Sequence, residues 1–218
     1  MKRSLIALAA AALSTFASAA VVTIDDFNGP DVNQLSAALN TTTTVTDAVR
    51  TSSITVLAGP ADGNGAYLTI GSNTFPTGLL EVANASGRDS EIMTSWALAG
   101  GVLPANAINV AFFLEVIMSD GNPTDLEFLL DGGSVASFSI APNTENQPVS
   151  FGLDATQVAM LSNGGTLGLK INGAVGWDLT LDSFGFSYDL PKSVPEPTSL
   201  ALVGMALLAG AATRRRKA

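Results

Sequence analysis

The sequence WDLTLDSFGFSY, residues Trp177–Tyr188, decides the fold class of this chain. Apolar side chains occupy every second position as far as Leu181, and the same spacing resumes from Phe184. A period of two is typical of a β-strand that buries one face. The pattern shifts by one residue at Asp182-Ser183, which predicts a β-bulge. The segment is therefore expected to form a long strand with its aromatic face in a core.

Shorter segments with alternating or apolar patterns precede this strand, roughly every 10 to 15 residues, between turns rich in Gly, Asn, Asp and Pro. About ten strands in one compact unit predict an all-β fold, an antiparallel two-sheet β-sandwich of jelly-roll type. Closing such a sandwich places the first strand, Val21–Phe27, near the last. The other predicted strands are Ile54–Ala58, Ala66–Gly71, Gly78–Val82, Ile92–Leu98, Asn109–Met118, Asp125–Leu130, Ser134–Ile140, Pro148–Leu153 and Thr166–Ile171.

Local signals predict little helix and two hairpin turns, the second of them at Asn163-Gly164-Gly165. Asp131-Gly132-Gly133 lies between two predicted strands, and glycine tolerates the positive φ that a tight hairpin needs. Asp154 followed by Gln157 forms a capping box, which predicts one or two helical turns. Residues 31–39 are a weaker case of the same kind. The threonine run 41–44 is expected to be a polar strand or a linker.

Composition limits what the predicted domain, residues 21–192, can do. It contains four of the ten cationic residues and eighteen of the nineteen acidic ones, a formal charge of −14. We therefore expect no nucleic acid partner, because binding one needs a clustered cationic face. The chain has no histidine and no cysteine. Ser–His and Cys–His catalysis, histidine-ligated zinc and disulfides are thereby excluded, whereas carboxylate chemistry stays open.

The last two dozen residues predict a membrane segment. Val194-Pro195-Glu196-Pro197 is followed by an uncharged run, 198–213, and then by Arg214-Arg215-Arg216-Lys217. As a helix with about 1.5 Å per residue the run covers roughly 24 Å, slightly less than a hydrocarbon core of ~30 Å. In the alternative, a buried C-terminal helix, the cations would adjoin a core without acidic partners. Behind a transmembrane helix they stay on the cytoplasmic side as a stop-transfer signal.

The string VPEPTSLALVGMALLAGAATRRRKA, Val194–Ala218, resembles the PEP-CTERM sorting signal of Gram-negative bacteria in order, spacing and composition. The resemblance implies that an exosortase, a membrane-embedded cysteine protease-like sorting enzyme, recognises Pro195-Glu196-Pro197. It also implies that the tail is removed and that the protein is released or attached outside the cell, in an exopolysaccharide or biofilm setting. It implies nothing about the preceding domain, because such signals follow unrelated domains.

The N-terminus predicts export. Lys2 and Arg3 form a positive n-region, Ser4–Leu13 an apolar h-region, and Ala17-Ser18-Ala19 or Ser18-Ala19-Ala20 a small-residue cleavage site. We expect the Sec translocon and signal peptidase to act on this segment. The predicted organisation is a signal peptide at 1–20, a β-sandwich domain at 21–192 and a sorting signal at 193–218. An inner-membrane intermediate would precede the cell surface or the extracellular matrix.

The two end strands carry a second resemblance. Ile24-Asp25-Asp26-Phe27 and Leu181-Asp182-Ser183-Phe184-Gly185-Phe186 are similar to the first and last strands of galactose-binding-like and carbohydrate-binding jelly rolls. In those families an acid in each of these strands helps to hold a structural Ca²⁺. By position, the role falls on Asp25 or Asp26 and on Asp182. Ca²⁺ takes 6–8 oxygen ligands, so backbone carbonyls would complete the set. The alternative is that these are solvated acids on a strand face.

Sugar binding by such a fold would use exposed aromatic rings, and the available platforms are Trp96, Trp177, Tyr67 and Tyr188. Trp177 is in phase with the leucines of the last strand, so we expect it in the core. Trp96 has serine and alanine as chain neighbours. It is expected to be exposed and is the candidate glycan-binding residue.

The sequence thus predicts a surface or matrix protein without enzymatic activity, structural or adhesive, with extracellular polysaccharide as a partner. The alternative is an exopolysaccharide-active glycoside hydrolase. Its candidate acids are Glu115 with Glu127 or Asp125, expected on neighbouring strands. Such an enzyme needs two carboxyl groups about 5–5.5 Å or 6.5–9.5 Å apart, one of them with a raised pKa.

Overall fold

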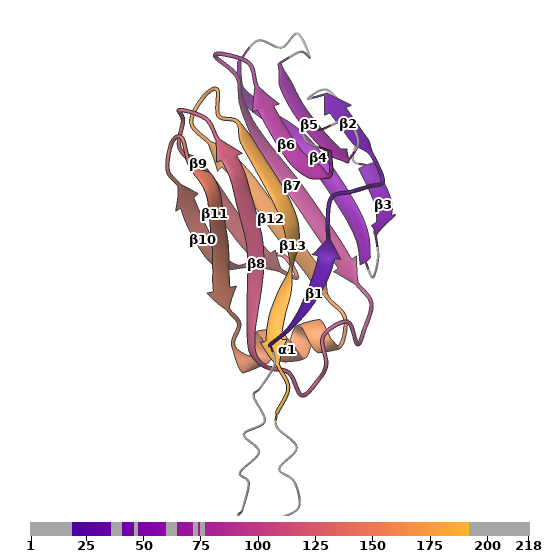
Figure 1. Ribbon diagram of the computed structural model, residues 1–218. Helices are drawn as coiled ribbons and strands as arrows, with labels where there is room; N and C mark the ends of the chain where they lie inside the picture. The colour runs from indigo at the N-terminus through magenta and orange to yellow at the C-terminus, as the bar shows by residue number, and fades with distance from the viewer. Residues whose placement is uncertain are drawn as a thin grey trace, which may run out of the picture. The chain divides into compact units, whose positions relative to one another are not determined.

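The computed structural model describes residues 19–35, 41–45, 48–59, 65–71, 74 and 77–191. These residues form two antiparallel sheets packed face to face (Figure 1), which confirms the predicted β-sandwich. The sorting motif, the predicted membrane helix and nearly all of the predicted signal peptide lie outside the described residues. Within the described part of the chain, no helix is both long and apolar enough to span a membrane.

Sheet A contains seven strands in the spatial order β11, β8, β13, β6, β5 and β2, with β1 beside β13. Their bounds are β1 (Ala19–Asp25), β2 (Val32–Leu35), β5 (Ala66–Gly71), β6 (Leu79–Asn84), β8 (Ile108–Ser119), β11 (Glu145–Gly152) and β13 (Leu179–Asp189).

Sheet B contains six strands in the order β10, β9, β12, β7, β4 and β3. Their bounds are β3 (Thr41–Val45), β4 (Ala48–Ala58), β7 (Asp89–Leu98), β9 (Thr124–Leu130), β10 (Gly133–Ile140) and β12 (Thr166–Gly173). The helix α1 (Ala155–Ser162) lies at one end of the sandwich, where the backbone N–H of Gly101 donates to the carbonyl of Ser162.

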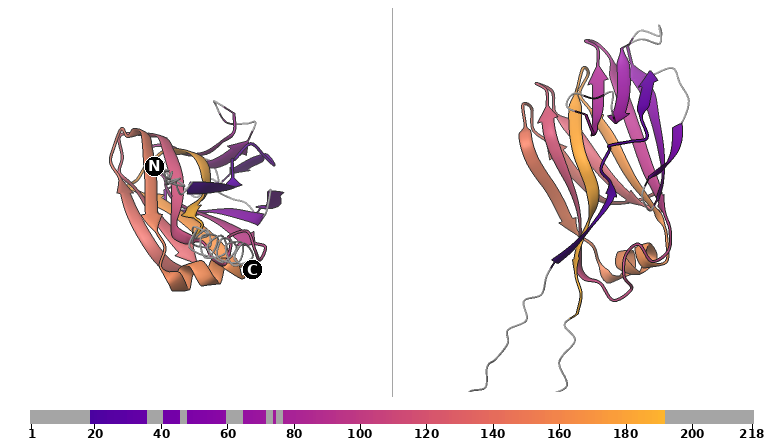
Figure 2. Two further views of the ribbon diagram at one scale, coloured as in Figure 1. Left: turned by 60° about the horizontal axis from the view of Figure 1, so that its bottom comes forward. Right: turned by 45° about the vertical axis from the view of Figure 1, so that its right-hand side comes forward.

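The last strand is central to sheet A. β13 pairs with β8 along one edge, and with both β6 and β1 along the other (Figure 2). In the β1–β13 ladder Val22 is opposite Phe186, so the predicted proximity of the first and last strands is confirmed. A register shift between Asp182 and Phe184 confirms the predicted bulge. The bulge keeps both halves of the apolar pattern on the core side of the sheet.

Aromatic rings from both sheets meet in the core. Phe184 of β13 stacks on Trp96 of β7 with ring centroids 4.5 Å apart, and on Phe112 of β8 at 5.6 Å. Phe112 in turn stacks on Phe128 of β9 at 6.1 Å. Each fully buried ring of this size contributes roughly 1.5–3 kcal/mol relative to exposure. These contacts bind the two sheets without any disulfide.

The local predictions hold at the hairpin and at the helix. Asp131 and Gly132 have φ of 48° and 81°, as a two-residue hairpin loop requires. At α1 the Asp154 side chain accepts from the backbone N–H of Gln157, and the Gln157 side chain accepts from the backbone N–H of Asp154. The predicted helix at residues 31–39 is wrong for residues 32–35, which form β2 and pair with β5, and residues 36–39 lie outside the described residues. For the threonine run the strand alternative holds, since it forms most of β3 and pairs with β4.

Candidate functional site

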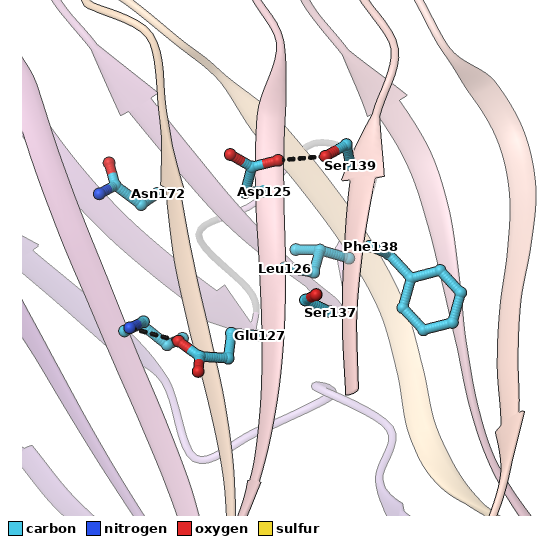
Figure 3. A pocket seen from close by; sticks show the side chains of 8 residues that line it. Asp125, Leu126, Glu127, Ser137, Phe138, Ser139 and Asn172 are labelled. Atoms are coloured by element: carbon cyan, nitrogen blue, oxygen red, sulfur yellow. Dashed lines mark hydrogen bonds and ion pairs between the residues drawn. The ribbon is translucent and has the colours of Figure 1, made fainter. Parts of the chain in front are cut away.

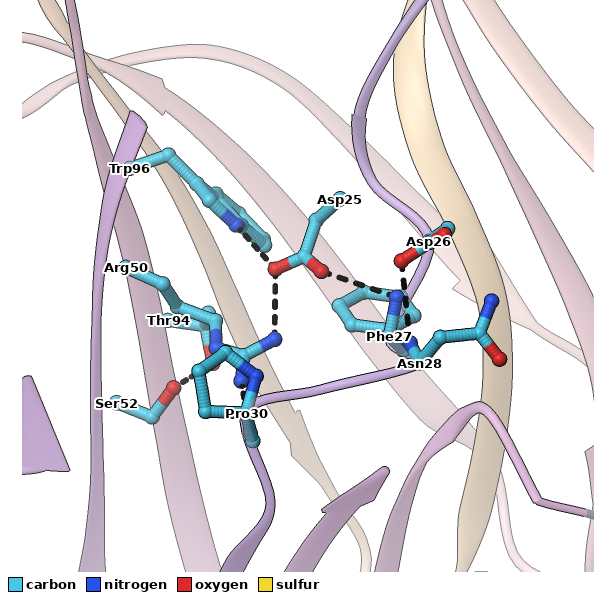
Figure 4. Close-up of polar contacts among 9 residues, drawn as sticks. All are labelled: Asp25, Asp26, Phe27, Asn28, Pro30, Arg50, Ser52, Thr94 and Trp96. Atoms are coloured by element: carbon cyan, nitrogen blue, oxygen red, sulfur yellow. Dashed lines mark hydrogen bonds and ion pairs between the residues drawn. The ribbon is translucent and has the colours of Figure 1, made fainter. Parts of the chain in front are cut away.

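Trp96 is wholly buried, so the prediction that it is exposed is wrong. Its indole N–H points at the carboxylate of Asp25 (Figure 4). Its neighbours Ser95 and Ala97 lie on the opposite face of β7, because successive side chains of a strand alternate. On its own face Trp96 follows Thr94 and precedes Leu98, both buried. A ring stacked inside the core offers no face to a sugar. Trp177, by contrast, is buried as predicted.

Asp25 is the polar centre of this part of the core. Its Oδ2 accepts from Nη1 of Arg50 and from Nε1 of Trp96, both at 2.8 Å. Its Oδ1 accepts from the backbone N–H of Phe27 at 3.0 Å, and Arg50 also donates to the carbonyl of Pro30. Asp25 therefore neutralises a buried arginine. Its burial and its pairing with Arg50 disfavour Asp25 as a calcium ligand, and that assignment stays a prediction.

The other two candidate calcium ligands do not converge with Asp25. Asp26 is exposed, and hydrogen bonding from Asn28 holds the pKa of its carboxyl below the ordinary value. Asp182 lies on the outer face of sheet A, opposite Glu115 in the ladder, whereas Asp25 faces the core. Within the described residues, no group of three or more acidic side chains is placed to hold a metal ion. Calcium binding by Asp26 or Asp182 stays a prediction.

The predicted hydrolase pairs do not form. Glu115 is on β8 of sheet A, and Asp125 and Glu127 are on β9 of sheet B, so these acids are not on neighbouring strands. The chain crosses from sheet A to sheet B after β8, whereas the sequence analysis expected neighbouring strands there. Asp125 and Glu127 do share one face of the sandwich, because they are two residues apart on a single strand.

These two acids line a groove of about 420 Å³ on the outer face of sheet B (Figure 3). The strand register arranges its side chains in two rows. Asp125 stands opposite Ser139 of β10 and Asn172 of β12, and Glu127 stands opposite Ser137 and Lys170. We call this surface the β9 groove, and its polar lining consists of Asp125, Glu127, Ser137, Ser139, Lys170 and Asn172.

The two carboxylates of the β9 groove differ in their partners. Glu127 forms an ion pair with Lys170, with side chains 27 % and 34 % exposed. The hydrogen bond from Lys170 lowers the pKa of Glu127, and the same contact raises the pKa of Lys170. Oδ1 of Asp125 accepts from the Ser139 hydroxyl at 2.5 Å. Among the described residues nothing donates to Oδ2 of Asp125, so this oxygen is open to a ligand.

Sequence reasoning missed the hydroxyl and amide members of the groove. Ser137 and Ser139 occupy outward positions of a predicted strand, so for them the alternation was a usable signal, whereas Asn172 lies just beyond the predicted strand Thr166–Ile171. The order of the strands within the sheet was not readable from the sequence. The groove depends on β9 lying between β10 and β12. In the chain, β10, a strand of sheet A and a helix separate β9 from β12.

The fold and the groove define an antiparallel β-sandwich with a polar groove on one outer face. Beyond the sandwich, residues 193–217 match the PEP-CTERM protein-sorting motif, which confirms the predicted sorting signal. The motif implies an exported protein that an exosortase processes at the membrane. No curated protein matches this chain.

Several solved structures resemble the sandwich at a distance. The family 11 carbohydrate-binding module of the cellulosomal cellulase Lic26A-Cel5E of Clostridium thermocellum is 13 % identical and has a TM-score of 0.34, covering 81 % of this chain and 98 % of that one. TmCBM61, in complex with β-1,4-galactotriose, is 11 % identical with a TM-score of 0.35, covering 62 % and 86 %. The Stig cyclase Fisc from Fischerella sp. TAU is 11 % identical with a TM-score of 0.39, covering 80 % and 100 %. At these scores the likenesses say nothing about ligands.

Proposed function

We propose that this chain is an exosortase-processed protein of the cell surface or extracellular matrix, and that its sandwich binds a polysaccharide through the β9 groove. The observation that carries the proposal is the composition of that groove. Hydroxyl, amide, carboxylate and ammonium groups stand side by side on three paired strands. A sugar chain presents hydroxyl groups that both donate and accept, and such a lining can meet both.

The groove suits weak, repeated binding. Each net hydrogen bond contributes about 0.5–1.5 kcal/mol, and the groove lining carries no tryptophan or tyrosine that could add stacking. A few such contacts correspond to dissociation constants on the order of 1 mM. Many copies on one surface or one polymer raise the overall affinity strongly through their effective concentration. A structural or adhesive role in an extracellular polysaccharide fits this regime.

The sorting signal supplies the route to that location. In this proposal the Sec translocon and signal peptidase act on residues 1–20, and the tail from Thr198 holds the chain in the membrane until exosortase acts at Pro195-Glu196-Pro197. The short segment between β13 and the motif then becomes the end of the mature protein. Arg214–Lys217 would stay on the cytoplasmic side.

A role in hydrolysis is disfavoured by the chemistry of the groove. A glycoside hydrolase needs a carboxyl group that keeps its proton near neutral pH. Lys170 has the opposite effect on Glu127, because it lowers the pKa of that carboxyl. We therefore propose binding without catalysis.

Affinity gel electrophoresis tests the proposal with exopolysaccharide from the producing bacterium cast into the gel. The wild-type mature protein should be retarded, and the double variant Ser139→Ala/Asn172→Ala should migrate more freely. Ser150→Ala, on β11 of sheet A, is the matched control and should behave like the wild type. A wild-type protein that the polysaccharide does not retard would contradict the proposal, as would equal retardation of all three proteins.

A further inference from the structure

The β9 groove has an excess of negative charge. Two of its side chains, Asp125 and Glu127, are carboxylates, and its one cation is Lys170. The ammonium group of Lys170 is already paired with Glu127, and the nearby charge of Glu91 on β7 also acts on it. Little of the positive charge of Lys170 is therefore left for a ligand.

The residues around the β9 groove do not offset its negative charge. Arg50 and Arg88 are 1 % and 2 % exposed, so neither guanidinium group reaches the surface. Lys170 is the remaining cation among the described residues, whereas carboxylates stand on both outer faces of the sandwich. An anionic polysaccharide that approached the groove would meet like charge, which disfavours binding.

From this arrangement we infer that the β9 groove selects polysaccharides that carry free primary amines, such as hexosamine units without N-acetyl groups, and that Asp125 binds the ammonium group. The inference rests on the proposed function, because it names the ligand class of the same groove. Oδ2 of Asp125 is the acceptor, since its other oxygen already takes the Ser139 hydroxyl and Glu127 is engaged by Lys170.

The geometry around Asp125 suits a cationic sugar. Ser139 holds the carboxylate from β10, and Asn172 stands opposite it on β12. An ammonium group at Oδ2 would leave the neighbouring sugar hydroxyls beside the Asn172 amide. Hydrogen bonds between ionised partners are about twice as strong as neutral ones and weaken with added salt.

Calorimetric titration of the mature protein separates the possibilities with three oligosaccharides of equal length. These are β-1,4-linked glucosamine with free amines, its fully N-acetylated form, and a uronic acid oligomer. At pH 6 and low salt we expect the amine form to bind about tenfold more tightly than the acetylated form, and the uronate to bind most weakly. Asp125→Asn should remove the tenfold preference, and added salt should reduce it.

The matched control is Glu115→Gln, which removes one carboxylate from the outer face of sheet A. It should keep the full preference for the amine form.

If Glu115→Gln lowers the preference as much as Asp125→Asn, the attraction belongs to the whole acidic surface and the inference is overturned. Equal binding of the amine and acetylated forms also overturns it, yet leaves the proposed function standing. If none of the three oligosaccharides nor the native exopolysaccharide binds, the proposed function itself fails. Melting temperatures of the variants confirm that each is folded.

Discussion

Asp25 of β1 and Arg50 of β4 form a buried ion pair with a contact of 2.8 Å, and this pair connects the first strand of sheet A to the opposite sheet. Arg50 stands opposite Trp96 in the β4–β7 ladder, so both donors reach the same carboxylate oxygen from sheet B. Asp25, which the sequence suggests as a calcium ligand, is therefore the counter-charge of Arg50 in the folded protein.

Replacing Asp25 is therefore expected to be severe. Asp25→Ala leaves the Arg50 guanidinium group buried without its counter-charge, which costs about 3–5 kcal/mol. Urea unfolding monitored by tryptophan fluorescence measures the change. Asp26→Ala, which removes the neighbouring exposed carboxylate, is the control and should alter stability by less than about 0.5 kcal/mol. Equal effects of the two substitutions would contradict the role of Asp25.

Trp96→Phe tests whether Trp96 acts as a buried core residue and not as a glycan-binding residue. The substitution keeps an aromatic ring in the core but removes the hydrogen bond to Asp25, so we expect a loss of about 1.5–3 kcal/mol. The folded variant should bind glycans as the wild type does, because the β9 groove is on the outer face of the sheet. Reduced glycan binding at unchanged stability would reverse this interpretation.

Gly185→Ala tests the pairing of the first and last strands. A methyl group at Gly185 would collide with the carbonyl oxygen of Val22 on β1 and with the ring of Phe113. We expect a loss of about 1–3 kcal/mol and faster amide exchange along β1. The control is Gly121→Ala, because apart from its chain neighbours no heavy atom of the protein lies within 4 Å of the position of its added methyl group. Unchanged exchange in β1 would argue against the pairing.

The shifted pKa of Asp178 should make the stability of the protein depend on pH. Desolvation raises the pKa of its carboxyl above the ordinary value of 3.8, and the charge of Asp120 adds to the effect. The folded state then binds a proton more readily than the unfolded state, so this group lowers stability as pH rises from 3.8 through the raised pKa.

Asp178→Asn should consequently stabilise the protein at pH 7, while its remaining carbonyl oxygen can still accept from the backbone N–H of Asn84. The gain should shrink on acidification and vanish below the ordinary pKa of 3.8. Urea unfolding at pH 7 and pH 4 measures it, with Glu145→Gln as an exposed control. A gain in stability of equal size at both pH values would contradict the raised pKa of Asp178.

The sorting motif predicts a processing defect. Replacing Pro195-Glu196-Pro197 by three alanines should leave the tail attached and the protein in the membrane fraction. Immunoblotting of membrane and extracellular fractions, with mass spectrometry of the mature ends, measures this. Replacing Lys192 by alanine, just before the motif, is the control and should leave processing intact. Normal release of the triple-alanine variant would contradict exosortase recognition.

The sequence predicted most strands because their patterns are local. The last strand, its bulge at Asp182 and the capped helix at Asp154 were all readable, since alternation and capping depend on residues close together in the chain. The short strand at residues 32–35 could not be predicted in this way, because its pairing with β5 prevails over its local helical signal.

The burial of Trp96 and the pairing of Asp25 with Arg50 could not be predicted from the sequence for one shared reason. The prediction for Trp96 rests on its chain neighbours, and that for Asp25 on its place in the first strand. In the structure both side chains face the core, where Trp96 and Arg50, from two strands of the other sheet, donate to Asp25. A strand pattern shows that two faces exist, and packing against the second sheet decides which groups share the inner one.

By itself, the sequence determined the fold class, the acidic character of the domain and the sorting signal at residues 193–217, because each is carried by composition or by a contiguous segment. Only the tertiary structure decided where the β9 groove lies. Its side chains come from three strands whose order in the sheet follows from long-range pairing, and pairing between distant segments leaves no local signature in the chain.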